Sequence, residues 1–295
     1  MNKFAIVGGC NVDYIAVSNE KLISKASNVG TISSSFGGVG RNIAENLANL
    51  GNDVTMFTAI GKDFCGESLK EYMETLGVKM NLSDSELSTG TYMVINDNDH
   101  DIVAAICDNR IISAISPDFI RSIFPKLNEF EFIGIDANLD QATIDYLFTN
   151  LKDKKIFVDT ISPEKAKKYN KYLDKIYLLK CNLKEARSLA SNDNGTPKEV
   201  CEELLKLGMK NLVISNGPED IYFADLGGEV KSFKVEKVTK FINTTGCGDA
   251  LTSGLIHELA KGQNLEKSLS FAAILAKLTL FSASSCSEEV RRYKD

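Results

Sequence analysis

The chain has 295 residues, of which 43% are hydrophobic and 25% are charged, and its formal net charge is −6. This is the composition of a globular protein, and the acidic charge without any basic cluster excludes a nucleic-acid surface. No apolar run approaches the roughly 20 residues of a membrane span, and the brief apolar stretch in "MNKFAIVGGCNVD" lacks the shape of a signal peptide.

Cysteine and histidine usage predicts neither disulfides nor a metal centre. The seven cysteines are scattered, odd in number and never spaced C-x-x-C, so we expect reduced thiols in a cytoplasmic protein. The two histidines, His100 and His257, are too few for a zinc site or for histidine-based catalysis, and we expect both on the surface or on helix faces.

Apolar β-type runs alternate with segments of helical period along most of the chain. The run "FAIVGGC" predicts a buried strand, and "RNIAENLANLG" predicts a helix with Ile43, Leu47 and Leu50 on one face that ends at Gly51. A strand over 54–61 and a helix over 66–77 follow. The range 90–109 instead reads as two β runs around a polar turn, which predicts an antiparallel hairpin that could be a lid, a dimer contact or an edge ribbon.

The alternation resumes after this hairpin and continues to the last helices. Ser116 and Pro117 predict the start of a helix. We expect strands over 130–138, 155–160, 175–182, 211–217 and 231–243, and helices over 141–151, 184–190, 197–208, from about 247, and over roughly 265–282. This order predicts a single α/β domain over 1–295 with a mainly parallel sheet, whose ligands bind beyond the carboxyl ends of the strands.

The stretch "NTTGCGDALTSG" places Asp249 where a glycine-rich turn becomes a helix. A helix N-terminus offers unpaired N–H groups to an anion, and Gly246 and Gly248 let the backbone approach a phosphate. A carboxylate in such a site makes sense if the anion is a phosphoryl group in transfer and Asp249 takes the proton of the attacking hydroxyl. The alternative is a helix cap with an acid that the helix dipole favours. Other nucleotide motifs are absent: there is no G-x-x-x-x-G-K-[ST], and Leu251 replaces the third glycine of G-x-G-x-x-G.

Two further stretches carry polar groups that suit a polyhydroxylated ligand. In "SFGGVGRNIAENLANLG", a glycine-rich loop that includes Gly38 precedes a helix opened by Arg41 and Asn42, whose amide both donates and accepts. In "GGCNVDY", Asn11 and Asp13 follow the first strand, and a carboxylate there can accept bonds from vicinal hydroxyls. Each stretch taken alone also fits an ordinary turn.

In order and spacing, N-x-D, GG-x-G-x-N and T-T-G-x-G-D resemble the ribokinase-like (PfkB-type) carbohydrate kinase family, from Phe4 to about Ser282. The segment "KCNLKEA" supplies the N-x-x-E of that family. The resemblance implies an ATP-dependent kinase with a three-layer α/β fold and a small β lid made by about 89–108 and part of 10–36.

The resemblance also implies a role for each motif residue. It makes Asp249 the catalytic base and the backbone of Gly246, Cys247 and Gly248 the anion hole. It implies that the sugar is bound by Asn11, Asp13, Gly38, Asn42 and Asn138, with Asp159 as a further site member. It implies that the nucleotide lies against Asn182, Ser215, Gly217, Thr245 and Gly248. It implies that Asn182 and Glu185 organise Mg²⁺ through water.

The chain departs from the family pattern at three places. Asn243 stands where the family usually has Asp beside a monovalent cation, so the resemblance leaves K⁺ activation open. Cys247 replaces a common alanine, and Cys181 replaces the proline of K-P-N-x-x-E. None of these changes removes a catalytic group.

Within the family, "GGVGRNIAENLANLG", "GKDFCGESL" and "DNRIISAIS" are most similar to the pseudouridine kinases. This resemblance implies pseudouridine as the acceptor and ATP as the donor. A kinase for another nucleoside or for a sugar such as adenosine, ribose or fructose remains an alternative, as does a catalytically silent binding protein on the same scaffold. A homodimer through the lid is left open.

Overall fold

The computed structural model describes residues 2–99 and 101–294, so that His100 lies outside the described residues. The strands are β1 (Lys3–Val7), β2 (Asn11–Ser18), β3 (Gly30–Gly37), β4 (Asp53–Thr58), β5 (Lys79–Leu82), β6 (Gly90–Asn96), β7 (Ile102–Asp108), β8 (Phe132–Asp136), β9 (Lys155–Asp159), β10 (Ile176–Asn182), β11 (Asn211–Ser215), β12 (Ile221–Asp225) and β13 (Lys231–Phe233). The α-helices are α1 (Val39–Asn49), α2 (Phe64–Thr75), α3 (Pro117–Leu127), α4 (Gln141–Asn150), α5 (Pro163–Ala166), α6 (Leu183–Ala190), α7 (Pro197–Lys206), α8 (Cys247–Ala260) and α9 (Leu265–Leu280). Short 3₁₀ helices are η1 (Arg110–Ala114), η2 (Lys167–Lys175) and η3 (Glu288–Tyr293).

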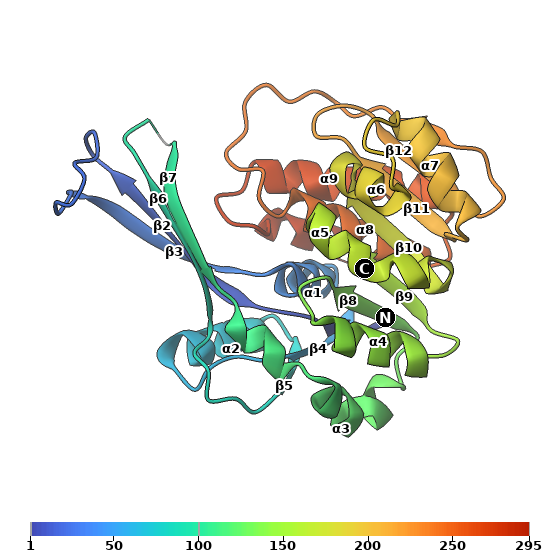
Figure 1. Cartoon of the computed structure of the whole chain (residues 1–295), viewed down its shortest axis with the longest axis horizontal. Helices are drawn as coiled ribbons and strands as arrows, with labels where there is room; N and C mark the ends of the chain where they lie inside the picture. The colour runs from blue at the N-terminus through green and yellow to red at the C-terminus, as the bar shows by residue number, and fades with distance from the viewer. Residues whose placement is uncertain (1, 100, 295) are drawn as a thin grey trace.

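The main sheet has the strand order β13-β12-β11-β10-β9-β8-β1-β4-β5 within the described residues. Every pairing from β11 to β5 is parallel, and only β12 and β13 run antiparallel to their neighbours. The predicted α/β class with a mainly parallel sheet is therefore confirmed (Figure 1).

Both faces of this sheet are buried, because successive side chains of a strand point to opposite sides. On β1, Phe4 and Ile6 join the core that lies against α1, α2, α8 and α9. Ala5 and Val7 join the second core, which lies against α3, α4, α6 and α7. The continuous apolar run of β1 is the signature of such a doubly covered strand.

Several helix ends are where the sequence predicts them. Gly51 follows α1 with φ of 86°, and the Ser116 hydroxyl accepts a hydrogen bond from the Phe119 N–H (3.3 Å) at the start of α3. His257 lies on α8 and is buried. No described helix has both the length and the apolarity needed to cross a membrane.

A second sheet, with the order β3-β2-β6-β7, projects from the main body (Figure 1). Strands β6 and β7 pair antiparallel, which confirms the predicted hairpin. Asn11 and Asp13 lie on strand β2 of this sheet, not in the turn that would be the ordinary alternative for "GGCNVDY". We call these four strands the lid sheet, and its action as a lid remains a prediction.

One predicted strand is wrong over most of its length. The alternating segment 231–243 forms a strand only over Lys231–Phe233, at the edge of the main sheet beside β12. From Lys234 to Asn243 the backbone forms no strand, and most of the side chains of this segment are exposed. Polar and apolar residues alternate there, but among the described residues no further strand offers hydrogen-bond partners to hold the segment extended.

Candidate functional site

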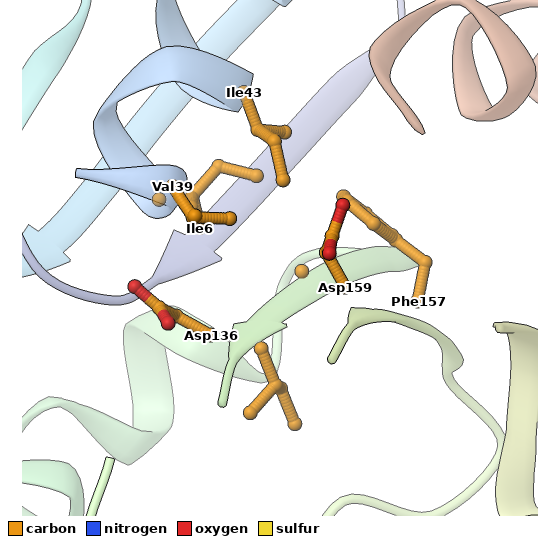
Figure 2. Close-up of a pocket in the computed structure, with 9 residues that line it drawn as sticks. Ile6, Val39, Ile43, Asp136, Phe157 and Asp159 are labelled. Carbon is orange, nitrogen blue, oxygen red and sulfur yellow. The ribbon is translucent and has the colours of Figure 1, made fainter. Parts of the chain in front are cut away.

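Four neighbouring parallel strands each end on a polar residue at the same edge of the main sheet. These residues are Asp136, Asp159, Asn182 and Ser215, at the ends of β8, β9, β10 and β11. Figure 2 shows Asp136 and Asp159 at a small cavity below Val39 and Ile43 of α1. The N-terminal ends of α1 and α8 close this edge, as expected for an α/β sheet.

Asp249 lies in the first turn of α8 and is 7% exposed. Its Oδ2 accepts a hydrogen bond from Asn42 Nδ2 (2.6 Å), so that the structure joins two predicted site residues directly. Burial, followed by the charge of Asp159, raises the pKa of Asp249 to about 7, against the opposing effects of Asn42 and Lys180. A carboxyl group with this pKa can exchange a proton near neutral pH.

A buried cation lies between the strand ends and α8. Lys180 is 6% exposed, and its Nζ donates to Asp159 Oδ2 (3.0 Å), which also accepts from the Thr252 hydroxyl (2.9 Å). Burial opposes the charge, but Asp159 and Asp249 outweigh it and raise the pKa of Lys180. The lysine therefore carries a positive charge directly beside the start of α8.

The turn before α8 brings backbone close to this charge. Gly246 is the N-cap of α8 with φ of 83°, and a β-carbon there would lie 1.9 Å from the Ser285 carbonyl oxygen. A β-carbon at Gly248 would lie 2.4 Å from Lys180 Nζ. Together with Cys247, these residues open a 14-residue helix whose first N–H groups lack partners within the helix. The predicted anion hole thus combines helix N–H groups with an ammonium.

Asp13 and Asn11 contact each other at the base of the lid sheet. Asn11 Nδ2 donates a hydrogen bond to Asp13 Oδ1. This bond lowers the pKa of Asp13, but burial raises it by more, so the pKa lies above its ordinary value. Gly38 is the N-cap of α1 and lies beside the Asn11 side chain. Three of the predicted sugar-binding residues are therefore neighbours, and Asn42 lies one helical turn further along α1.

Asn138 lies in a cleft of about 350 Å³ between the lid sheet and the main body. Its Oδ1 accepts a hydrogen bond from Lys165 Nζ (2.5 Å). The cleft is lined by Cys107, Asn109, Arg110, Ile112, Ser113, Asn138, Asp140 and Lys165. Cys107 connects the cleft to Asp13, because Asp13, Tyr92 and Cys107 form one row across β2, β6 and β7.

The predicted nucleotide residues lie at and after the ends of β10 and β11 and in the turn before α8. Asn182 and Ser215 are register partners on β10 and β11, and Gly217 follows with φ of 58° in open space. Thr245 is exposed in the turn before α8. These residues share the carboxyl edge of the sheet with Asp249.

Asn182 and Glu185 form a capping box at the start of α6. Asn182 Oδ1 accepts from the Glu185 N–H (3.0 Å), and Glu185 Oε1 and Oε2 accept from the Asn182 side-chain and backbone N–H groups. The Thr160 hydroxyl also donates to Glu185 (2.7 Å), and burial raises the pKa of this carboxyl group. A fixed carboxylate is the hard oxygen donor that Mg²⁺ prefers, and a contact through water suits a carboxylate already held this way.

Asn243 precedes α8 and is half-buried. Its Oδ1 accepts a hydrogen bond from the Thr245 N–H (2.9 Å), so this oxygen orders the turn. Within the described residues no three His, Cys, Asp or Glu side chains gather to hold a metal ion directly.

Sequence reasoning did not assign four residues that the structure places at the site: Asp136, Lys165, Lys180 and Ser285. Asp136 and Lys180 carried a usable signal, because each is a charged residue inside an apolar strand run. Asp136 accepts from the Gly9 N–H (3.0 Å) and is 3% exposed. Lys165 and Ser285 belong to no motif, and only the tertiary fold reveals them.

Comparison with known proteins agrees with this geometry. The model of the pfkB family of carbohydrate kinases matches residues 1–290. The chain is 32% identical to pseudouridine kinase of Escherichia coli over 93% of this chain and 89% of that protein. It is 31% identical to an uncharacterised sugar kinase of Escherichia coli over 95% of this chain and 78% of that protein. The ribokinase structure of Thermotoga maritima superposes with a TM-score of 0.84 at 21% identity, covering 99% of both chains. The chain therefore has a ribokinase-like fold and belongs to the pfkB family of carbohydrate kinases.

Proposed function

We propose that this kinase transfers the γ-phosphoryl group of ATP to the ribose 5′-hydroxyl of pseudouridine, giving pseudouridine 5′-phosphate and ADP. The observation that carries the proposal is the buried Asn42–Asp249 pair at the N-terminus of α8, beside the cation of Lys180. The relative at 32% identity supports the choice of acceptor.

In the proposed reaction, Asp249 accepts the proton of the 5′-hydroxyl as its oxygen bonds to the γ-phosphorus. The bond from that phosphorus to the oxygen of the leaving ADP breaks. The backbone N–H groups of Gly246, Cys247 and Gly248 face the charge on the phosphoryl oxygens, and Lys180 adds a positive charge behind them. Asp13 and Asn11 bind the ribose hydroxyls, which positions the 5′-oxygen for attack.

Asn182 and Glu185 would hold Mg²⁺ through water, and the ion would neutralise charge on the phosphates of ATP. Dependence on K⁺ stays a prediction. The side-chain oxygen of Asn243, at the position that the resemblance places beside a monovalent cation, accepts a hydrogen bond from the backbone of its own turn. A cytoplasmic location also stays a prediction.

The cleft beside Asn138 suits the base of a nucleoside. Asn109 and Cys107 reach it from the lid hairpin, and Lys165 reaches it from the main body. Of the two polar residues Asp108 and Asn109, Asn109 lines the cleft and is the one that we propose to read the base. Asp108 is occupied by Arg110 in a bidentate ion pair (2.9 and 2.7 Å).

Two alternatives to this proposal can be weighed against particular observations. A kinase for another nucleoside or for a sugar would use the same base and anion hole, and the sugar kinase relative at 31% identity keeps this alternative open. A silent binding protein has no need of Asp249, Asn182 and Glu185 together, and all three are held in ordered hydrogen bonds here.

The test is ADP release by purified protein with ATP and Mg²⁺ against a panel of pseudouridine, uridine, adenosine, ribose and fructose. Pseudouridine presents an N1–H donor where uridine has a C–H, and a site built to bond that donor loses several kcal/mol with uridine. We expect kcat/KM for pseudouridine to exceed that of every other acceptor by at least about tenfold. Equal or better turnover of uridine or ribose would refute the assignment of pseudouridine as the acceptor, but the protein would still be a kinase.

We also propose that two copies associate through the lid sheet. Cross-strand neighbours share a face, and the row of Asp13, Tyr92 and Cys107 faces the cleft. The opposite face, which we call the outer lid face, carries Ile32, Met93, Ile95 and Ile106, which are 76%, 44%, 38% and 72% exposed. Exposed aliphatic side chains grouped on one face favour a protein partner.

A further inference from the structure

Arg41, the third residue after the Gly37–Gly38 pair, is a charged side chain that is 3% exposed. A buried guanidinium is stable only when hydrogen bonds replace its water. Arg41 Nη1 forms an ion pair with Glu45 Oε2, and Nη2 donates to the Phe36 carbonyl oxygen (2.7 Å) and the Ser285 hydroxyl (2.7 Å). Nη2 also donates to Asn42 Oδ1. The guanidinium thus reaches the residue that contacts Asp249.

These contacts decide which way the Asn42 amide faces. Its Oδ1 accepts from Arg41 and from the Ser285 hydroxyl (2.9 Å), while its Nδ2 donates to Asp249 (2.6 Å). An amide turned by 180° would place its NH₂ group against the donors of Arg41 and its oxygen against a carboxylate. Both contacts would be repulsive, so only the observed orientation is compatible with a charged Arg41.

Glu45 in turn fixes the guanidinium. Arg41 and Glu45 are four residues apart on α1, which places them on one helix face. The second oxygen of Glu45 accepts from the Tyr72 hydroxyl (2.8 Å) on α2. A continuous chain of donors and acceptors therefore runs from α2 through Glu45, Arg41 and Asn42 to Asp249, and bonds in such a chain strengthen one another.

We propose that Arg41 is a positioning residue for phosphoryl transfer: it holds the Asn42 amide so that Nδ2 always donates to Asp249. That hydrogen bond fixes the rotation of the Asp249 carboxyl group and favours its charged, proton-accepting form. The inference rests on the proposed role of Asp249 as the base. It adds that catalysis depends on a side chain that touches neither substrate nor ATP.

The experiment compares Arg41→Met with the double variant Arg41→Met/Glu45→Met, which does not leave the Glu45 carboxylate buried without its partner. Arg291→Met is the matched control, because Arg291 donates to Asn49 (3.0 Å) at the other end of α1. Circular dichroism and thermal unfolding establish that each variant folds. Steady-state kinetics with the best acceptor of the panel then give kcat, KM and the pH dependence of kcat.

We expect both Arg41 variants to lower kcat by about 10- to 100-fold, with a smaller change in KM, because the base is misplaced rather than removed. The acid limb of the kcat profile should move up by about one pH unit, because the Asn42 amide is no longer held toward Asp249 and the hydrogen bond that favours the charged form of Asp249 is weakened. Asp136, Asp159 and Lys180, which also act on the pKa of Asp249, are unchanged in these variants. The control should keep the wild-type kcat and pH profile.

An unmoved acid limb in a folded Arg41 variant would overturn the inference, as would a kcat no lower than that of Arg291→Met. Asp249→Asn, measured alongside, separates this failure from failure of the proposed function. If Asp249→Asn retains turnover, the base assignment fails. If Asp249→Asn is inactive while the Arg41 variants behave as wild type, only the role of Arg41 is refuted.

Discussion

The carboxyl group of Asp249 has neighbours that act on its pKa in opposite directions. Burial and the negative charge of Asp159 raise the pKa, whereas the Asn42 amide and the Lys180 ammonium lower it, and the balance is a pKa of about 7. A base is most efficient when its pKa lies close to the pH at which it works. The residues that hold Asp249 in place are therefore also the residues that tune it.

Asp249→Asn tests this assignment directly. The amide keeps the size of the side chain and cannot accept the proton, so kcat should fall by about 10²- to 10⁴-fold while acceptor and ATP binding stay within a few-fold. Steady-state kinetics and titration calorimetry measure the two effects separately.

The pH profiles of the wild type and of Asp249→Asn provide the control. Asp249 must be ionised to act, so the wild-type kcat should fall as the pH drops through about 7, where the carboxyl group gains its proton. The residual activity of Asp249→Asn should lack this limb. Near-normal turnover of the variant, or a limb that persists in it, would assign the proton transfer to another group.

At the scale of elements, the N-terminus of α8 depends on the segment that follows α9. Gly246 has φ of 83°, and its missing side chain leaves room for the Ser285 carbonyl oxygen. Gly246→Ala therefore adds both left-handed strain and a collision with backbone. Left-handed strain alone costs about 1–3 kcal/mol of unfolding free energy.

Gly262 is the matched control for this substitution. It follows α8 with φ of 82°, and a β-carbon there would meet nothing within 4 Å. Chemical denaturation should show a larger loss of unfolding free energy for Gly246→Ala than for Gly262→Ala. Only Gly246→Ala should also lower kcat, because the anion hole shifts. Equal losses at both glycines would mean that the Ser285 segment moves aside without consequence.

The lid sheet gives the second prediction at this scale. Ile106→Asp places a charge on the outer lid face, where Ile106 is 72% exposed and neighbours Met93. If that face joins two copies, light scattering should show a dimer for the wild type and a monomer for the variant. Leu226→Asp, at an apolar residue 59% exposed outside the lid, should leave the mass unchanged. A monomeric wild type would refute the association.

At the scale of the whole molecule, the features predictable from sequence are those that depend on near neighbours. The strands and helices follow from apolar period, and glycine or serine marks where α1 ends and α3 begins. The position of Asp249 at the first turn of α8 is predictable for the same reason, since a glycine-rich turn and a helical period meet there.

Features that depend on distant neighbours are not predictable in this way. The burial of Arg41 requires Ser285, which is 244 positions away in the chain, and the proposed role of Lys180 requires the register of β9 with β10. The extended pattern of 231–243 fails because β13 ends where no strand continues beside it. An alternation of polar and apolar residues indicates only that the backbone prefers an extended conformation. A strand forms only where another strand is available to pair with it.

The contact between Ser285 and Asn42 also has a consequence for the order in which the molecule is assembled. The two residues are 243 positions apart, and Asn42 and Asp249 are 207 apart. Strand β1, made first, pairs on one side with β8, so the middle of the sheet closes only after residue 136 exists. Domains with such distant pairings fold slowly, because long loops must be closed before their contacts form. While the chain emerges from the ribosome, no stretch that stops short of residue 285 contains every partner of the Arg41 guanidinium. The cluster that we propose to be catalytic is therefore among the last parts of the molecule to form.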